Sequence, residues 1–377
     1  MAEKVQTQVE KSSMIKKDTI IVHCGNDRSG CSWYRQRFQA MLLMTIRAGE
    51  INPVITPFEV TDGEVLTRAA AIVIGRAYKD ENGGNMIRHY HAKRKKYGYR
   101  IFVDYDDLIF SLDGTQATPE YNTSKIDTVE AGKYIATMLQ KVDGVTVSTH
   151  FLKQCIVQLF GFTAVTVIPN AIPRYCFGRP ERRDRVRDVP RVLYAGGIYH
   201  FTEDNHGDFS GPWIPWLYEA VKRDKIELHM FDRPTFLGDL ADNVTVHGGE
   251  TALEFPAVDT SIQPDIYLAP LQENNFNRAK SNLKLLEATA VGAAFLGSDF
   301  EGSPYTEAHP LSKVRPDTTP EQLEIQFQKL CRHYSEVMDY QFRLMEMQGY
   351  WMDSDHYLKR YLHTYFGDYL RVNGRKV

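Results

Sequence analysis

This chain of 377 residues lacks the features that mark membrane, secreted and zinc-binding proteins. No apolar run approaches the roughly 20 residues that cross a bilayer, and no apolar segment follows the charged start as it would in a signal peptide. The 5 cysteines are odd in number and never form a C-x-x-C pair, which argues for reduced thiols and against a disulfide or zinc framework. We therefore expect a cytoplasmic protein that makes no membrane contact.

Motifs for several other chemistries are also missing. There is no Walker A sequence and no G-x-S-x-G sequence, so neither a P-loop nucleotidase nor a serine hydrolase is indicated. The net charge of −3 gives by itself no reason to expect nucleic acid. However, the chain up to Gly178 has 22 Lys and Arg against 18 Asp and Glu, a net of +4, whereas the remainder has 23 against 30, a net of −7. We expect the two parts to have different partners.

What is present is an alternation of short apolar runs and helical stretches from Asp18 onward, which is typical of parallel α/β sheets. The strand candidates are Thr19–His23, Pro53–Phe58, Ala71–Gly75, Arg100–Asp104, Gly144–Ser148 and Ala164–Ile168, followed by Arg191–Gly196, Ile226–Phe231, Val244–His247, Asp265–Leu268 and Ala293–Leu296. The helix candidates are Trp33–Arg47, Asn85–Lys96, Thr128–Gln140 and His150–Leu159.

Two domains are expected from this pattern. Segment 179–190 is rich in charge and poor in apolar residues, as linkers are. We predict a disordered lead (1–17), a first domain (18–178), this linker (179–190), a second domain (191–340) and C-terminal helices (341–377). The amphipathic stretch 320–370 carries aromatic residues that we expect in the core: Tyr350, Trp351, Tyr357, Tyr361 and Tyr365.

The segment from Phe276 to Asp299 carries the strongest functional signal. It follows a strand-like run and begins a helix with these polar residues: Asn277, Arg278, Lys280, Ser281, Asn282 and Lys284. Free N–H groups and the helix dipole favour anions at such a position, and open α/β sheets bind ligands beyond the carboxyl ends of their strands. Glu287 lies in the apolar part of the helix, which we expect to end at Gly292. The alternative is a helix packed on a sheet with one buried, paired glutamate.

This segment resembles the donor-sugar motif of GT-B glycosyltransferases, especially the retaining family 4-like enzymes that use nucleotide-sugars. The resemblance rests on Glu287-Ala288-Thr289-Ala290-Val291-Gly292 and on Ser298-Asp299. It implies a GT-B fold: α/β, with two Rossmann-like doubly wound domains facing a central cleft, and a C-terminal helix crossing back to the first domain. It also implies that Glu287 bonds the ribose of the nucleotide and that the basic residues hold the diphosphate. Ala279 replaces the family's first acid, so contacts to the donor sugar must come from elsewhere.

The second domain begins with a strand that ends in Gly196-Gly197. Without a Cβ, such a pair lets backbone amides approach a diphosphate closely. It resembles the first glycine turn of the family's donor domain, although the usual basic residue after it is missing. A plain tight turn is the alternative.

Acceptor-side candidates lie in the first domain. Arg28 lies in the loop after the first strand and Arg35 at the start of the helix that follows, where a guanidinium could contact a phosphate or the acceptor, or be solvated. Asp104, Asp106 and Asp107 end another strand. In similar GT-B proteins such acids face the cleft, where one could orient or deprotonate an acceptor hydroxyl. The alternatives are a D-x-D metal site or a set of caps and salt bridges.

Two further strings resemble cleft-facing strand ends of the family, Val147-Ser148-Thr149 before His150 and Val167-Ile168-Pro169-Asn170-Ala171. They add His150 to the acceptor or phosphate contacts.

A basic patch raises the question of a DNA acceptor. It contains Arg88, Lys93, Arg94, Lys95, Lys96 and Arg100, interleaved with His89, Tyr90, His91, Tyr97 and Tyr99. Such cations bind phosphates, and exposed aromatic residues stack on bases, although a solvated helix face is the alternative. Segment 179–191 adds six arginines. These features favour a flipped hydroxymethylated pyrimidine in double-stranded bacteriophage DNA as the acceptor, in the host cytoplasm. Surface polysaccharide, lipid or a small acceptor is the competing possibility.

We therefore predict a glycosyltransferase that moves a hexose or pentose from a nucleotide-diphosphate donor, with UDP favoured, to a hydroxyl group. Lys280 would act on the charge of the departing diphosphate. No cofactor and no metal ion are expected to be required, and the protein is expected to be a monomer or weak dimer. A nucleotide-sugar epimerase and a non-catalytic nucleotide-binding protein are the rival functions.

Overall fold

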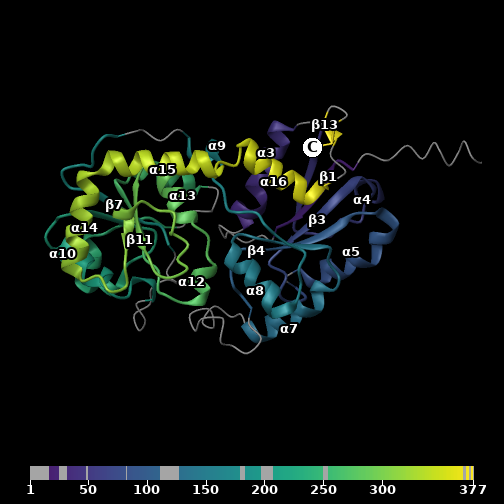
Figure 1. Cartoon of the computed structure of the whole chain (residues 1–377), viewed down its shortest axis with the longest axis horizontal. Coiled ribbons are helices and arrows are strands. Elements are labelled where there is room, and N and C mark those ends of the chain that lie inside the picture. Colours follow the sequence, from purple (N-terminus) through teal and green to yellow (C-terminus); the bar gives the residue numbers. More distant parts are fainter. Residues whose placement is uncertain are drawn as a thin grey trace, which may run out of the picture.

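The computed structural model describes residues 17–24, 32–47, 50–81, 83–110, 127–178, 183–196, 207–248, 254–367, 371–372 and 375–376. These residues form two α/β halves side by side, each built around a six-stranded sheet (Figure 1). Within both sheets every pair of neighbouring strands is parallel. The two doubly wound halves predicted from the sequence are therefore confirmed.

The first sheet has the order β2-β1-β3-β4-β5-β6. Its strands are β1 (Thr19–His23), β2 (Asn52–Thr56), β3 (Ala69–Gly75), β4 (Arg100–Tyr105), β5 (Gly144–Val147) and β6 (Val165–Val167). All five residues of β1 are buried, because helices cover both faces of a parallel sheet. The strand order reverses between β1 and β3, and such a switch point is where open sheets bind ligands.

The second sheet has the order β12-β11-β10-β7-β8-β9. Its strands are β7 (Arg191–Tyr194), β8 (Glu227–Met230), β9 (Thr245–Val246), β10 (Ile266–Ala269), β11 (Ala294–Ser298) and β12 (Lys313–Val314). Here the order reverses between the neighbours β7 and β10, which places the switch point of this half at their carboxyl ends.

The helices begin and end at residues suited to those positions. Thr149 accepts the N–H of Leu152 at the start of α8, and Thr319 forms a capping box with Gln322 at the start of α14. The α-helices are α3 (Phe38–Ile46), α4 (Gly63–Arg68), α5 (Gly84–Tyr97), α7 (Thr128–Leu139), α8 (His150–Phe160), α9 (Arg174–Phe177), α10 (Trp213–Lys222), α11 (Phe255–Ile262), α12 (Asn275–Ala279), α13 (Leu283–Ala290), α14 (Pro320–Arg332), α15 (Tyr334–Gln348) and α16 (Asp355–Phe366). Shorter turns are η1 (Trp33–Arg37), η3 (Gly207–Phe209), η4 (Thr235–Asn243) and η5 (Pro310–Ser312).

The C-terminal helices join the two halves. Figure 1 shows α15 on the second half and α16 beside α3 and β1 of the first. Between them, the N–H of Ile172 donates to the carbonyl of Tyr350 at 2.8 Å, and the N–H of Met352 donates to the carbonyl of Ile172 at 3.0 Å. The predicted crossing back is confirmed. The predicted aromatic core is confirmed as well, since these side chains are at most 9% exposed: Tyr350, Trp351, Tyr357, Tyr361 and Tyr365.

Two predicted helices have a different form in the structure. Trp33–Arg47 begins with the π-helical turn η1 and continues as α3. The helix expected from Phe276 onward is divided into α12 and α13, because Lys280 has an extended backbone with ψ of 153°. The glycine cap at its end is confirmed by the left-handed φ of 76° at Gly292. In the part of the chain that the structure describes, no helix is both long and apolar enough to cross a membrane.

Candidate functional site

The candidate site lies at the carboxyl edge of the second sheet, where β10 leads into α12 and α13. Asn274 begins α12, because its side chain accepts the N–H of Asn277 at 2.7 Å. The chain then leaves helical geometry at Lys280 and restarts from Asn282, whose side chain does not cap α13. The first N–H groups of α13 therefore lack a side-chain cap at the break between the two helices, where a ligand can accept them.

Asn277 and Lys280 meet an acid that the sequence did not indicate. The Nδ2 of Asn277 donates to Asp208 Oδ1 at 2.8 Å, and the Nζ of Lys280 lies 3.6 Å from Asp208 Oδ2. Asp208 belongs to η3, the turn that precedes α10, and is 7% exposed. Because it lies 69 residues from Asn277 in the chain, no local pattern could have associated the two.

The other predicted cations of this segment are paired as well. Arg278 contacts Glu273 at 2.8 Å, and the Nζ of Lys284 contacts Glu287 Oε2 at 2.8 Å. Both side chains of these cations are just over a quarter exposed, at 27% and 29%. A diphosphate would therefore compete with carboxylates for both of them.

Glu287 is at the centre of a buried polar cluster. It is 2% exposed and accepts the Tyr267 hydroxyl at 3.1 Å in addition to its contact with Lys284. A buried, paired glutamate is what we expect if α13 only packs on the sheet. The position of Glu287 at the carboxyl edge of the sheet is what a donor site requires. Contact with a ribose remains a prediction.

A second acid, Asp259, accompanies this cluster. It is fully buried, and neither carboxyl oxygen has a hydrogen-bond partner. Burial, and then the charge of Glu287, raise the pKa of Asp259 well above its ordinary value. The same two causes, in the same order, raise the pKa of Tyr34, which comes from the first half of the molecule. The cluster is therefore placed at the contact between the halves, where Tyr34 of the first half and Tyr267 of the second belong to one hydrophobic core.

Direct hydrogen bonds connect the two halves at α12 and α13. Asn170 Nδ2 donates to Ser281 Oγ at 2.7 Å, and Thr149 Oγ1 donates to the carbonyl of Ala279 at 3.0 Å. Within the second half, Asn282 Nδ2 donates to Glu307 at 3.2 Å. Of the predicted donor residues, Ser281 thus contacts a strand end of the first sheet directly.

Gly196 follows β7 at this edge. A Cβ there would stand 2.1 Å from the Tyr194 hydroxyl, so a side chain would require that ring to move. Gly197 and Arg28, both predicted contacts, lie outside the described residues.

Arg35 and Asp104 form a buried ion pair instead of facing an open cleft. Arg35 donates to both carboxyl oxygens, at 3.0 and 2.6 Å, and the two side chains are 3% and 4% exposed. Thr146 donates to the same carboxylate at 2.6 Å. Asn170 accepts from Arg35 at 3.2 Å. These contacts give both residues a structural role, and the predicted acceptor role of Arg35 and catalytic role of Asp104 stay predictions.

Asp106 and Asp107 share a cation that the sequence analysis missed, Arg76. Its Nε donates to Asp106 at 2.7 Å, and its Nη2 pairs with Asp107. Arg76 follows β3 with a left-handed φ of 47°, which is costly for a residue with a Cβ and persists only where the surroundings impose it. The sequence feature that could have identified Arg76 as a site residue is its position directly after a buried strand.

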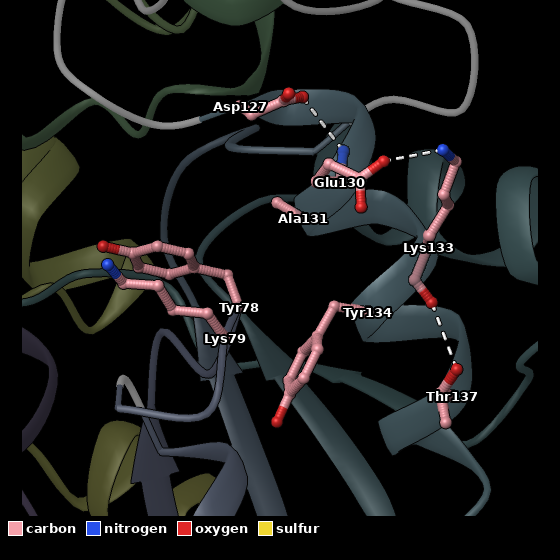
Figure 2. Close-up of a pocket in the computed structure, with 8 residues that line it drawn as sticks. All are labelled: Tyr78, Lys79, Asp127, Glu130, Ala131, Lys133, Tyr134 and Thr137. Atoms are coloured by element: carbon pink, nitrogen blue, oxygen red, sulfur yellow. Dashed lines mark hydrogen bonds and ion pairs between the residues drawn. The ribbon is translucent and has the colours of Figure 1, made fainter.

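A groove of about 520 Å³ opens near this cluster, at the carboxyl side of β3 (Figure 2). Tyr78 and Lys79 line one side of it, and Glu130 and Tyr134 of α7 line the other. The Tyr134 ring is held in place because its hydroxyl donates to Asp80. The volume of this groove is in the usual range for small-molecule sites.

Two of the six cations in the predicted basic patch are paired with acids. Arg88 pairs with Asp80 at 2.6 Å and Arg94 with Asp143 at 3.1 Å, and Lys93 contacts His89 at 3.1 Å. Two aromatic residues of the patch cannot stack on bases, because Tyr90 is 0% and Tyr99 3% exposed. His150, the first residue of α8, is exposed. The patch gives little support to a DNA acceptor.

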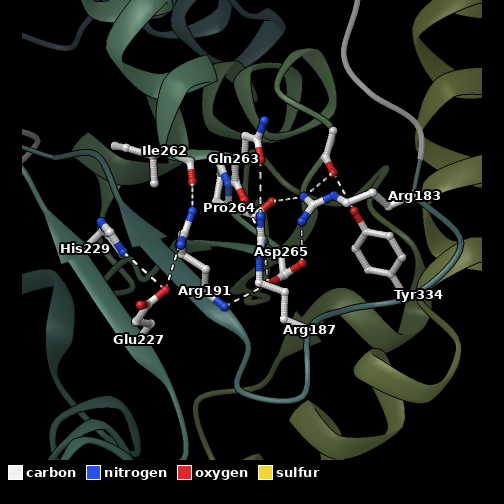
Figure 3. A network of polar contacts seen from close by, with 11 residues as sticks. Arg183, Arg187, Arg191, Glu227, His229, Ile262, Gln263, Pro264, Asp265 and Tyr334 are labelled. Atoms are coloured by element: carbon white, nitrogen blue, oxygen red, sulfur yellow. Dashed lines mark hydrogen bonds and ion pairs between the residues drawn. The ribbon is translucent and has the colours of Figure 1, made fainter.

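Two arginines of the predicted linker, Arg183 and Arg187, are held away from the site. The buried Asp265 accepts from Arg183 at 2.6 Å, from Arg187 at 2.9 Å and from the N–H of Arg191 at 2.8 Å (Figure 3). Asp265 directly precedes β10, so this network lies at the edge of the sheet opposite the site.

Comparison with known proteins gives a fold and no close relative. No known protein family and no curated protein matches the sequence. A glycosyltransferase structure from Rickettsia africae is similar with a TM-score of 0.55 and 13% identity, covering 93% of this chain and 98% of that one. HepE (Alr3699) from Anabaena in complex with UDP is similar with a TM-score of 0.59 and 9% identity, covering 92% and 99%. Its complex with UDP-glucose gives a TM-score of 0.56 and 8% identity, covering 92% and 98%. The chain therefore has the GT-B fold, as the sequence predicted.

Proposed function

We propose that the protein is a glycosyltransferase that moves a sugar from a nucleotide-diphosphate donor, UDP being the first candidate, to a hydroxyl acceptor. The observation that carries this proposal is the convergence of Asn277, Lys280 and the uncapped start of α13 at the switch point of the second sheet. That UDP and UDP-glucose are bound by HepE, a protein of the same fold, supports the choice of nucleotide.

Catalysis would be electrostatic. The N–H groups at the start of α13 and the ammonium of Lys280 would stabilise the charge that grows on the diphosphate as the bond to the sugar breaks. Glu287 would bond the ribose from its position in the same helix. Asp106 and Asp107, fixed by Arg76 at the facing strand ends, would orient the acceptor hydroxyl.

The acceptor would bind to the first half. In the groove of Figure 2, two tyrosine rings stand among side chains of both charges, Lys79 and Glu130 among them. This chemistry suits a saccharide or another polar hydroxyl compound. It favours a polysaccharide or small acceptor over DNA, because Arg88 and Arg94 are already paired with acids.

The test is a transfer assay in excess EDTA. UDP-glucose, UDP-galactose and UDP-N-acetylglucosamine are each offered with alkyl glycosides, oligosaccharides or duplex DNA containing hydroxymethylcytosine, and release of UDP is measured. We expect acceptor-dependent release that EDTA does not reduce, because arginines already hold the carboxylates of Asp104, Asp106 and Asp107.

Variants locate the activity. Lys280→Ala should lower kcat more than it raises KM, since its charge acts on the transition state. Lys225→Ala, which removes a lysine paired with Glu324 on the surface of the same half, is the matched control. Absence of UDP release with all donors, or wild-type kinetics of Lys280→Ala, would contradict the proposal. If hexose is added to the DNA and to no other acceptor, DNA becomes the favoured acceptor again.

A further inference from the structure

Asp208, Asn277 and Lys280 lie together, and binding of a diphosphate does not explain the acceptor oxygens among them. Two of the three carry oxygen acceptors, and these lie at the carboxyl ends of the neighbouring strands β7 and β10. We propose that these three residues, the Asp208 subsite, bind adjacent hydroxyl groups of a neutral donor sugar. This inference rests on the proposed glycosyl transfer and names the part of the donor that selects the substrate.

The subsite is rigid because its members hold one another. Asp208 Oδ1 accepts the N–H of Gln272 at 3.0 Å and the Nδ2 of Asn277 at 2.8 Å. Asn277 Nδ2 also donates to the carbonyl of Gln272 at 2.8 Å. Burial, and then the charge of Asp208 among others, raise the pKa of Tyr194, the last residue of β7. The carboxylate is therefore fixed close to α12, and the neighbouring Phe209 packs against Tyr194 at the end of β7, with ring centroids 4.6 Å apart.

One atom of the subsite needs a partner that the described protein residues do not supply. Asn277 is 2% exposed, and its Oδ1 accepts no hydrogen bond. The orientation of the amide is determined, because its Nδ2 faces two oxygen acceptors. A buried acceptor left without a donor is unfavourable. A sugar hydroxyl can supply that donor, whereas an ionised phosphate has no proton to donate.

The charges favour a neutral ligand. The Lys280 ammonium, 3.6 Å from Asp208, is balanced by that carboxylate, so the subsite offers no excess positive charge to a second anion. One hydroxyl group would donate to Asn277 Oδ1 and a neighbouring one to Asp208, while Lys280 would donate to a hydroxyl oxygen. A sugar that carries its own carboxylate would be repelled by Asp208. The neighbouring Ala279 offers no polar side chain to this ligand.

Calorimetric titration separates this subsite from nucleotide binding. The probes are UDP, UDP-glucuronate and whichever of UDP-glucose, UDP-galactose and UDP-N-acetylglucosamine binds the wild type most tightly. We expect Asp208→Asn to weaken this neutral donor about tenfold or more, the effect of losing a hydrogen bond to a charged group, with little change for UDP. UDP-glucuronate should bind the wild type more weakly than the neutral donor, and Asp208→Asn should reduce that difference.

Two further variants make the test decisive. Asn277→Ala removes the unpaired Oδ1 and should show the same selective loss, so the test remains valid if Asp208→Asn fails to fold. Asp242→Asn, at a surface acid paired with Arg233 and 73% exposed, is the matched control. Equal losses for UDP and the neutral donor, or no loss for either, would overturn the subsite while leaving the proposed function in place. If wild-type protein binds neither UDP nor a UDP-sugar, the proposed function fails instead.

Discussion

At the scale of single residues, the candidate site is a set of paired charges. Lys280 lies beside Asp208, Lys284 contacts Glu287 and Arg278 contacts Glu273. The sequence indicated the cations but not the carboxylate that pairs with Lys280, because that acid comes from a distant turn. Arg76 was missed for the same reason, since its value as a site residue depends on two acids that follow the next strand.

A prediction at this scale concerns the buried Asp259. Burial raises its pKa above the ordinary 3.8, so the folded protein keeps a proton that the unfolded chain loses above that pH. The pKa shift of Asp259 therefore reduces stability progressively as pH rises from 3.8 toward the raised pKa of the folded state, by at most about 1.4 kcal/mol per pH unit. Asp259→Asn does not ionise, so it should be more stable than the wild type at pH 8.

Thermal unfolding of both proteins between pH 5 and pH 8 measures this effect, which should grow with pH. A variant less stable than the wild type at pH 8 would show that Asp259 is ionised and paired. Asp242→Asn, at an exposed acid, is the control for removal of one charge.

At the scale of elements, the sequence predicts strands better than it predicts contacts. β1 begins and ends where the apolar run Thr19–His23 does, because a strand buried on both faces has no polar alternation to obscure its limits. β12 has only two residues, too few to form a pattern. The break before α13 was also missed, since it accompanies contacts made at a distance: Phe276 and Ala279 of α12 pack into the core of the first half.

The same limit applies to the ends of strands. The rule that ligands bind beyond the carboxyl ends placed Asn277, Lys280 and Ser281 at an edge where they do meet other polar groups. For Asp104, the rule predicted the correct edge of the first sheet. It did not predict that the Asp104 side chain is buried, because the Arg35 that covers it comes from a different element. Whether a strand-end residue is open to a ligand depends on tertiary packing, which a single sequence does not encode locally.

At the scale of the whole molecule, each half has a hydrophobic core of its own, and a further core is shared by both halves. A single cluster of buried side chains includes Ile20 and Val73 of the first sheet, Tyr267 and Phe295 of the second, and Tyr361 of α16. The backbone pairing of Ile172 with Tyr350 and Met352 joins the two segments that cross between the halves. Unfolding one half would expose apolar surface of the other.

We therefore expect one cooperative thermal transition for the full chain in the absence of ligand. In calorimetry, the measured enthalpy and the van't Hoff enthalpy should agree, which is the test of a two-state process. Two resolved transitions would show that the halves are stable independently and that the shared core contributes little.

The central claim is that a nucleotide-sugar binds at the carboxyl edge of the second sheet, over α12, α13 and η3. Hydrogen exchange followed by mass spectrometry, with and without UDP-glucose, tests it most directly, because bound ligand slows the opening of the backbone that it contacts. We predict slower exchange in peptides that cover 207–209 and 275–290, with little change in peptides of the linker network around Asp265. Binding of UDP-glucose that protects only peptides of the first half, or the linker network, would contradict the account.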